Sequence, residues 1–188
     1  MSSFDYGTLG SLVTGTAVIL GSFGANLAMA QDKEALIKNA LSAAPPGVAE
    51  TATVMDNKGN LLQQGSGAYT CFPYEGGLTA AMCADAEWLV WADAYMARKE
   101  DYQPSKFGLA YMLAGDPPDG GASNIDPFAT EATADNQWVV EGPHVMILVP
   151  DPAMLEGMTT DPDSGGPYVM WEGTPYAHIM MPTGPRPK

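Results

Sequence analysis

The chain has 188 residues, with 22 Asp and Glu against 8 Lys and Arg, so its formal net charge is −14 at neutral pH. Such a chain repels the phosphates of nucleic acids and of anionic lipids, which argues against a role on nucleic acid or at a membrane surface. The length suits one globular domain, and we expect its partners to be metal cations, small neutral molecules or basic proteins.

Residues 1–30 predict a signal peptide for export. Residues 12–23 are uncharged and mostly apolar, and small residues up to Ala30 precede a predicted cleavage before Gln31. An uncleaved membrane anchor is the alternative, although glycines interrupt the apolar run and no basic flank follows it. The mature protein would then be a single domain over 31–188, periplasmic or secreted.

The two cysteines, Cys71 and Cys83, are predicted to form a disulfide, because export delivers the chain to an oxidising compartment. Closing a loop of this size would stabilise the fold by roughly 3 kcal/mol in the chain-entropy model. A thiolate metal site that includes Met82 is the alternative, but no C-x-x-C pair accompanies it.

Two helices are predicted in the N-terminal half of the mature chain, over 32–44 and 85–99. Asp32 can cap the first, and proline and glycine residues follow it. In the second, Trp88 and Trp91 share one apolar stripe, which indicates a buried face.

Strands are predicted before and after the second helix. Two of them are joined by Asp-Asn-Lys-Gly-Asn, which is typical of a β-hairpin, and Asp-Pro dipeptides recur in the later loops. We therefore predict one α+β domain with an antiparallel sheet, two helices packed on one face, and long loops rich in Gly, Pro and Asp. The predicted strands are 51–55, 61–64, 67–72, 107–113, 137–140, 144–149, 168–171 and 177–181.

The only two histidines each precede a methionine by two residues, as His144 with Met146 and His178 with Met180. Residues i and i+2 of a strand lie on the same face, so each segment would present an imidazole beside a thioether. If the two strands are neighbours, the four side chains form a donor set that favours copper, especially Cu(I).

This pattern resembles the ligands of periplasmic copper chaperones of the cupredoxin-like type, in which a His, a downstream Met and a terminal His-x-Met bind one copper. The resemblance implies His144, Met154, His178 and Met180 as ligands. Methionine is also a common filler of apolar cores, so a structural role for these residues is the alternative.

Three further segments, 134–139, 142–148 and 175–180, resemble a group of uncharacterised exported bacterial proteins. They read Ala-Asp-Asn-Gln-Trp-Val, Gly-Pro-His-Val-Met-Ile-Leu and Pro-Tyr-Ala-His-Ile-Met. The resemblance implies an exported bacterial domain and no particular activity.

A small exported enzyme is the second class of function, with His144 or His178 as general acid or base beside a carboxylate. A carboxylate that orients one imidazole nitrogen would favour this class, whereas neighbouring thioethers would favour a metal. The candidate carboxylates are Asp135, Glu141 and Glu172, and the candidate pocket aromatics are Trp138, Tyr168, Trp171 and Tyr176. A structural domain without catalytic function is the third reading.

Calcium is a weaker cofactor candidate than copper. Residues 161–166, with Glu172 at the twelfth position, resemble an EF-hand calcium loop. Gly165 stands where a ligand is expected, and Pro167 prevents the exiting helix, so we expect a plain glycine-rich turn.

Overall fold

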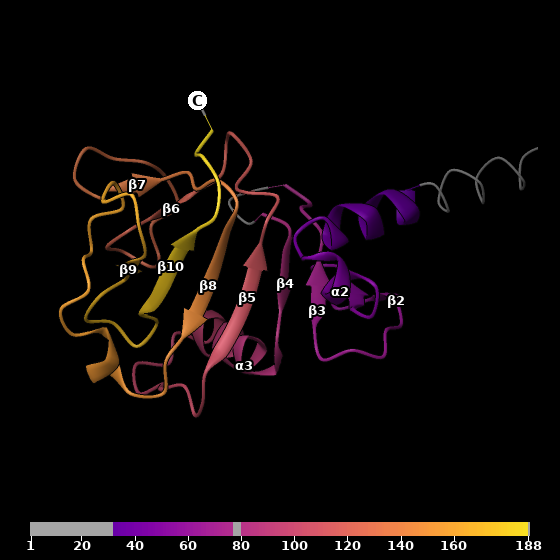
Figure 1. Ribbon diagram of the computed structural model, residues 1–188, viewed down its shortest axis with the longest axis horizontal. Coiled ribbons are helices and arrows are strands. Elements are labelled where there is room, and N and C mark those ends of the chain that lie inside the picture. The colour runs from indigo at the N-terminus through magenta and orange to yellow at the C-terminus, as the bar shows by residue number, and fades with distance from the viewer. Residues whose placement is uncertain (1–31, 77–79, 188) are drawn as a thin grey trace, which may run out of the picture.

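The computed structural model describes residues 32–76 and 80–187 (Figure 1). The predicted signal peptide and its cleavage site before Gln31 lie outside the described residues. Within the described ranges, no helix has both the length and the apolar character needed to cross a membrane.

The body of the molecule is an eight-stranded sheet in the order β2-β1-β3-β4-β5-β8-β10-β9. Its strands are β1 (Thr53–Met55), β2 (Leu61–Gln63), β3 (Thr70–Phe72), β4 (Met82–Ala84), β5 (Gly108–Met112), β8 (His144–Leu148), β9 (Tyr168–Met170) and β10 (His178–Pro182). A separate ribbon pairs β6 (Ala122–Ser123) with β7 (Trp138–Val139). The predicted α+β class is confirmed, but the sheet is mixed, because β1 runs parallel to β3.

The principal helices are the N-terminal helix over 32–41 and α3 (Ala86–Met96). Two short helical turns, α2 (Pro46–Ala49) and the 3-10 turn η1 (Pro152–Leu155), were not predicted. Strand β4 was also missed, because its sequence Met-Cys-Ala is too short to show alternation and has no β-branched side chain.

The predicted hairpin between β1 and β2 is confirmed. Asp56 begins the turn, and its Oδ1 accepts the backbone N–H groups of Lys58 and Asn60 at 2.9 and 2.7 Å. Gly59 has a φ of 83°, which a residue with a side chain rarely adopts. The turn is therefore specified by residues that the sequence pattern already identified.

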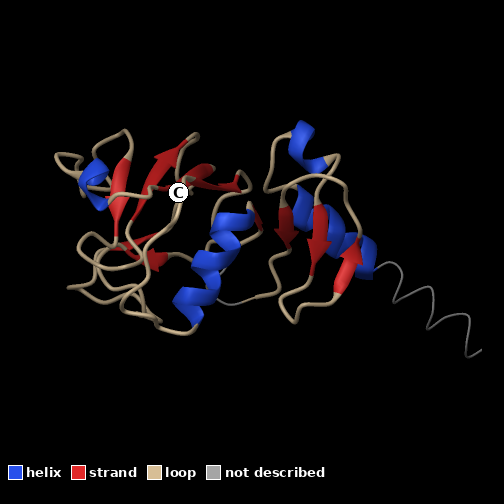
Figure 2. Cartoon of the chain, turned by 90° about the horizontal axis from the view of Figure 1, so that it is seen from below, coloured by secondary structure: helices blue, strands red, loops and turns tan. Residues whose placement is uncertain are grey.

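The expectation that both helices pack on one face of the sheet is wrong. Cys83 packs into a core with Ala40 of the N-terminal helix, whereas the next residue, Ala84, packs into a core with Trp88 of α3. Successive residues of a strand point to opposite faces, so the two helices cover opposite faces. In Figure 2 the two helices accordingly lie beside different sets of strands.

Helix α3 is fixed to β5 by a cap and by a close approach. Asp85 accepts the backbone N–H of Trp88 at 3.0 Å and that of Leu109 at 2.8 Å, so one carboxylate joins the helix to the strand. A Cβ added to Gly108 would lie 3.2 Å from the Trp88 ring. The absence of a side chain at Gly108 lets the helix lie close against the sheet, and Trp88 is only 1% exposed.

The predicted disulfide joins Cys71 and Cys83, which are direct partners in the β3–β4 register. The two cysteines belong to the core under the N-terminal helix, and neither is exposed. The bond therefore cross-links the sheet where its N-terminal three strands meet the other five.

Replacing both cysteines, as Cys71→Ala with Cys83→Ala, should lower the free energy of unfolding by about 2–4 kcal/mol, because the unfolded chain regains the entropy of an open loop. Urea denaturation of the variant and of the oxidised wild type measures the difference. Reduced wild type is the control and should match the variant; equal stability of all three proteins would contradict the prediction.

Asp85→Ala should lower the free energy of unfolding by roughly 2 kcal/mol, because the start of α3 and the Leu109 N–H both lose their acceptor. Asp93→Ala is the matched control, since Asp93 is an exposed aspartate of the same helix. Urea denaturation should separate the two variants, and a similar loss for both would show that the cap is unimportant.

Candidate functional site

A cavity of about 230 Å³ lies between α3 and the sheet face that carries both histidines. His144 and His178 are 1% and 2% exposed, and both line the cavity. The remaining wall is mostly apolar and combines thioethers with aromatic rings. The methionines are Met82, Met112, Met146, Met170 and Met180, and the rings are Trp88, Trp91, Tyr95 and Trp171.

The strand register arranges these donors in rows across the sheet. His144 on β8 lies directly opposite Met112 on β5, and Met146 on β8 lies opposite Met180 on β10. Partners in one row of an antiparallel pair have Cβ atoms about 5 Å apart, and the next row on the same face lies about 7 Å away. His144 therefore has Met112 as its cross-strand partner, and Met146 and Met180 form the next row on the same face.

His178 occupies the other end of the cavity. His144 pairs with Pro182, which is four residues from His178 along β10, so about 13 Å of strand separates the two histidine positions. The two imidazoles share a face, as the sequence predicts, but Met146 and Met180 lie between them. We expected both imidazoles and both thioethers to meet at one point. The strand register does not favour that arrangement.

Both imidazoles are oriented in the same way by the backbone. Nδ1 of His144 lies 2.7 Å from the carbonyl oxygen of Gly142, and Nδ1 of His178 lies 3.0 Å from that of Tyr176. A carbonyl oxygen only accepts, so in each case Nδ1 donates the hydrogen bond. The neutral imidazole then keeps its lone pair on Nε2, the nitrogen that a metal or a ligand would use.

His178 lies among three tryptophans. Its ring centroid is 5.4 Å from that of Trp88, 5.8 Å from that of Trp91 and 5.1 Å from that of Trp171, each in an edge-on arrangement. Burial in this apolar environment disfavours the charged imidazolium and lowers the pKa of His178 to about 4. His178 is therefore uncharged at neutral pH.

Carboxylates approach the His144 end. Asp116 lines the cavity there, and its Oδ2 accepts the backbone N–H of Glu141 at 2.7 Å. Burial raises the pKa of the Asp116 carboxyl, while the hydrogen bond from Glu141 lowers it to a smaller extent. Asp116 begins one of the Asp-Pro dipeptides that the sequence analysis assigned to loops. Its place in the cavity was therefore missed.

Glu141 is held by Arg186 rather than by a histidine. Nε of Arg186 donates to Oε2 at 2.7 Å and Nη2 donates to Oε1 at 3.1 Å, which gives a two-point ion pair. Arg186 also pairs with Asp163, so the basic C-terminal tip folds back onto the acidic half of the chain. Neither imidazole hydrogen-bonds to a carboxylate within the described part of the chain.

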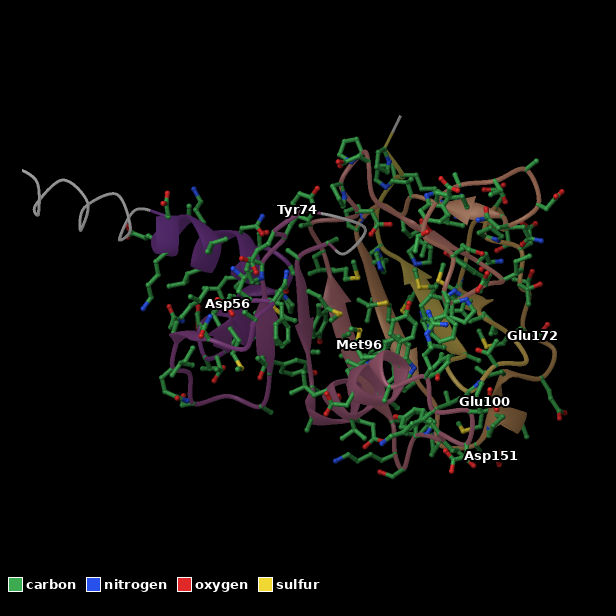
Figure 3. All side chains as sticks on the ribbon, turned by 180° about the vertical axis from the view of Figure 1, so that it is seen from behind. Asp56, Tyr74, Met96, Glu100, Asp151 and Glu172 are labelled. Carbon is green, nitrogen blue, oxygen red and sulfur yellow. A yellow bond between two sulfur atoms is a disulfide. The ribbon has the colours of Figure 1, made fainter. Side chains whose placement is uncertain are left out.

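Several predicted site residues lie away from the cavity. Asp135 is on an exposed loop, Glu172 is exposed at the outer edge of the molecule (Figure 3), and Met154 is 48% exposed on η1. Of the candidate aromatics, Trp171 lines the cavity, whereas Trp138, Tyr168 and Tyr176 do not. The ligand set implied by the copper-chaperone resemblance is therefore wrong at Met154.

The described residues contain no group of three or more His, Cys, Asp or Glu side chains that could hold a metal ion. In the segment that resembles a calcium loop, the carboxylates have other partners. Asp163 pairs with Arg186, and Asp161 accepts the backbone N–H of Asp163. A metal in the cavity would therefore need thioether ligands.

Comparisons with protein-family models, with curated proteins and with solved structures returned no match for this chain.

The low pKa of His178 makes stability depend on pH. An unfolded histidine titrates near its ordinary value of 6.5, so below that pH the unfolded chain binds a proton that the folded protein does not bind until about pH 4. The contribution of His178 to the free energy of unfolding is thus complete above pH 6.5 and is lost as the pH falls toward 4.

In urea denaturation, the difference in unfolding free energy between wild type and His178→Gln should shrink by roughly 3 kcal/mol between about pH 7 and about pH 4. The comparison removes the titration of all other groups, because both proteins share them. A difference that stays constant over this range would show that His178 is protonated as easily in the folded protein as in the unfolded chain.

Proposed function

We propose that the protein binds Cu(I) at the His144 end of the cavity, through the imidazole of His144 and the thioethers of Met112, Met146 and Met180. Met112 is the cross-strand partner of His144, and Met146 and Met180 form the next row on the same face. The side chains of these four residues all line the one cavity.

The donor types support a soft metal ion. Thioether sulfur and neutral imidazole nitrogen favour Cu(I), whereas calcium and magnesium need several oxygen ligands. The negative charge of the chain would raise the local concentration of cations without selecting among them. Selectivity would come from the thioethers, which outnumber the carboxylates around His144.

The observation that carries this proposal is the orientation of His144. Its Nδ1 donates to the carbonyl oxygen of Gly142, an arrangement that fixes the tautomer and leaves the lone pair on Nε2, the nitrogen that would bind the metal. General acid–base work is less well supported, because it would favour a carboxylate on one nitrogen, and Glu141 is held by Arg186.

Purified protein should compete with a chromophoric chelator for one Cu(I) per chain. Met112→Leu and His144→Gln should each weaken binding by more than about tenfold, because even the loss of a supporting residue around a metal costs this much. Leucine conserves the volume of methionine, so Met112→Leu should leave the cavity packed.

Met154→Leu is the matched control and should bind Cu(I) like wild type, because Met154 lies on η1 outside the cavity. His178→Gln should also retain binding. Failure of the wild type to compete would contradict the proposal, and so would a Met112→Leu variant with unchanged affinity. Loss of binding in His178→Gln alone would indicate a metal site at the tryptophan end and would contradict the proposed ligands.

A further inference from the structure

The tryptophan end of the cavity contains buried hydrogen-bond donors that the proposed copper site does not use. Trp138 and Trp171 each donate their indole N–H to a backbone carbonyl, that of Gly120 at 3.1 Å and that of Ser123 at 2.6 Å. The indole N–H groups of Trp88 and Trp91 are buried and have no partner among the described residues. Both of these tryptophans line the cavity with other atoms of their rings, because the indole nitrogens themselves are enclosed by protein.

An acceptor lies beside these two donors. The ring of His178 is in edge-on contact with both indoles, and its Nδ1 is occupied by the Tyr176 carbonyl oxygen. Nε2 is therefore the nitrogen left to accept a hydrogen bond. An acceptor without a partner in an apolar environment costs free energy, so a ligand that donates a hydrogen bond to Nε2 would recover that cost on binding.

The walls at this end suit a flat, apolar group. The rings of Trp91, Tyr95 and Trp171 are parallel to within 7°, with centroids 5.3 to 5.9 Å apart. Trp171 is held in place by two hydrogen bonds, from its backbone N–H to Asn124 and from its indole to Ser123. Such a preformed aromatic surface favours an aromatic ligand.

Charge and size restrict the ligand further. No Lys or Arg is among the lining residues of this cavity, whereas Asp116, Asp126 and Glu141 are. An anion would enter the cavity without a compensating cation, which is unfavourable at this degree of burial. The whole cavity, at about 230 Å³, exceeds the roughly 150 Å³ of a cavity that takes up benzene, so it has room for a single substituted ring.

We propose that the tryptophan end of the cavity binds a small uncharged phenol, whose ring packs against the aromatic side chains and whose O–H donates to Nε2 of His178. The hydroxyl group supplies the one donor that Nε2 can accept from. The site does not depend on Cu(I) at the His144 end, so it is tested on metal-free protein.

Three probes of similar size separate the contributions. Phenol carries the ring and the hydroxyl group, toluene carries the ring alone, and benzoate carries a negative charge. Metal-free protein should bind phenol roughly 3- to 10-fold more tightly than toluene, the range that corresponds to a net hydrogen bond, and should bind benzoate most weakly. Isothermal titration calorimetry measures all three.

Nitrogen-15 NMR reports directly on the indole rings against which the bound phenol would pack. Saturation with phenol should shift the indole N–H resonances of Trp88 and Trp91, while the resonance of Trp138 is the internal control and should stay in place, because Trp138 does not line the cavity. This readout needs only the wild-type protein.

His178→Leu should remove the preference for phenol over toluene while the affinity for toluene changes little. The proposal is overturned if toluene or benzoate binds wild type as tightly as phenol does. It is equally overturned if phenol leaves the Trp88 and Trp91 resonances unmoved, a result that does not depend on whether the His178 variant folds.

Discussion

Strand β4 is the element on which the rest of the structure depends, because its three residues serve two hydrophobic cores. Cys83 points into the core under the N-terminal helix, and its neighbours Met82 and Ala84 point toward the core under α3. The disulfide to Cys71 fixes the register on one side of β4, and Asp85, the next residue, caps α3 and binds β5 on the other. A slip of one residue in β4 would exchange the two faces and separate α3 from the sheet.

The α3 face of the sheet is mostly apolar, and it carries two imidazoles that each have one of their two ring nitrogens in a hydrogen bond. Each imidazole uses Nδ1 on a backbone carbonyl two residues earlier and retains Nε2 for the cavity. Burial keeps His178 uncharged, so its lone pair is available at neutral pH. An apolar wall with a few well-oriented polar atoms is the usual character of a ligand site, and here it supports both the copper proposal and the phenol proposal.

The two ends of the cavity differ in their neighbours. Around His144 the register supplies thioethers, and the carboxylates there are engaged with the backbone or with Arg186. Around His178 lie three indole rings, together with Met170, its cross-strand partner on β9. Exposed apolar residues on the outside of the helix, such as Met96 at 79%, contribute to neither end (Figure 3). One sheet face thus presents two chemically different environments, which the register offsets by four residues along β10.

Features that depend on near neighbours along the chain could be predicted from the sequence. These are the hairpin turn at Asp56, the buried stripe of α3 and the two His-x-Met strands, because turn chemistry and strand or helix period act over a few residues. The pairing of the two cysteines could also be predicted, because the chain has only two. Three other features become visible only in the folded chain: which helix covers which face, the four-residue offset between His144 and His178, and the presence of Met112 and Asp116 in the cavity. These depend on the register between strands that are far apart in sequence, and the period of a single strand contains no information on that register.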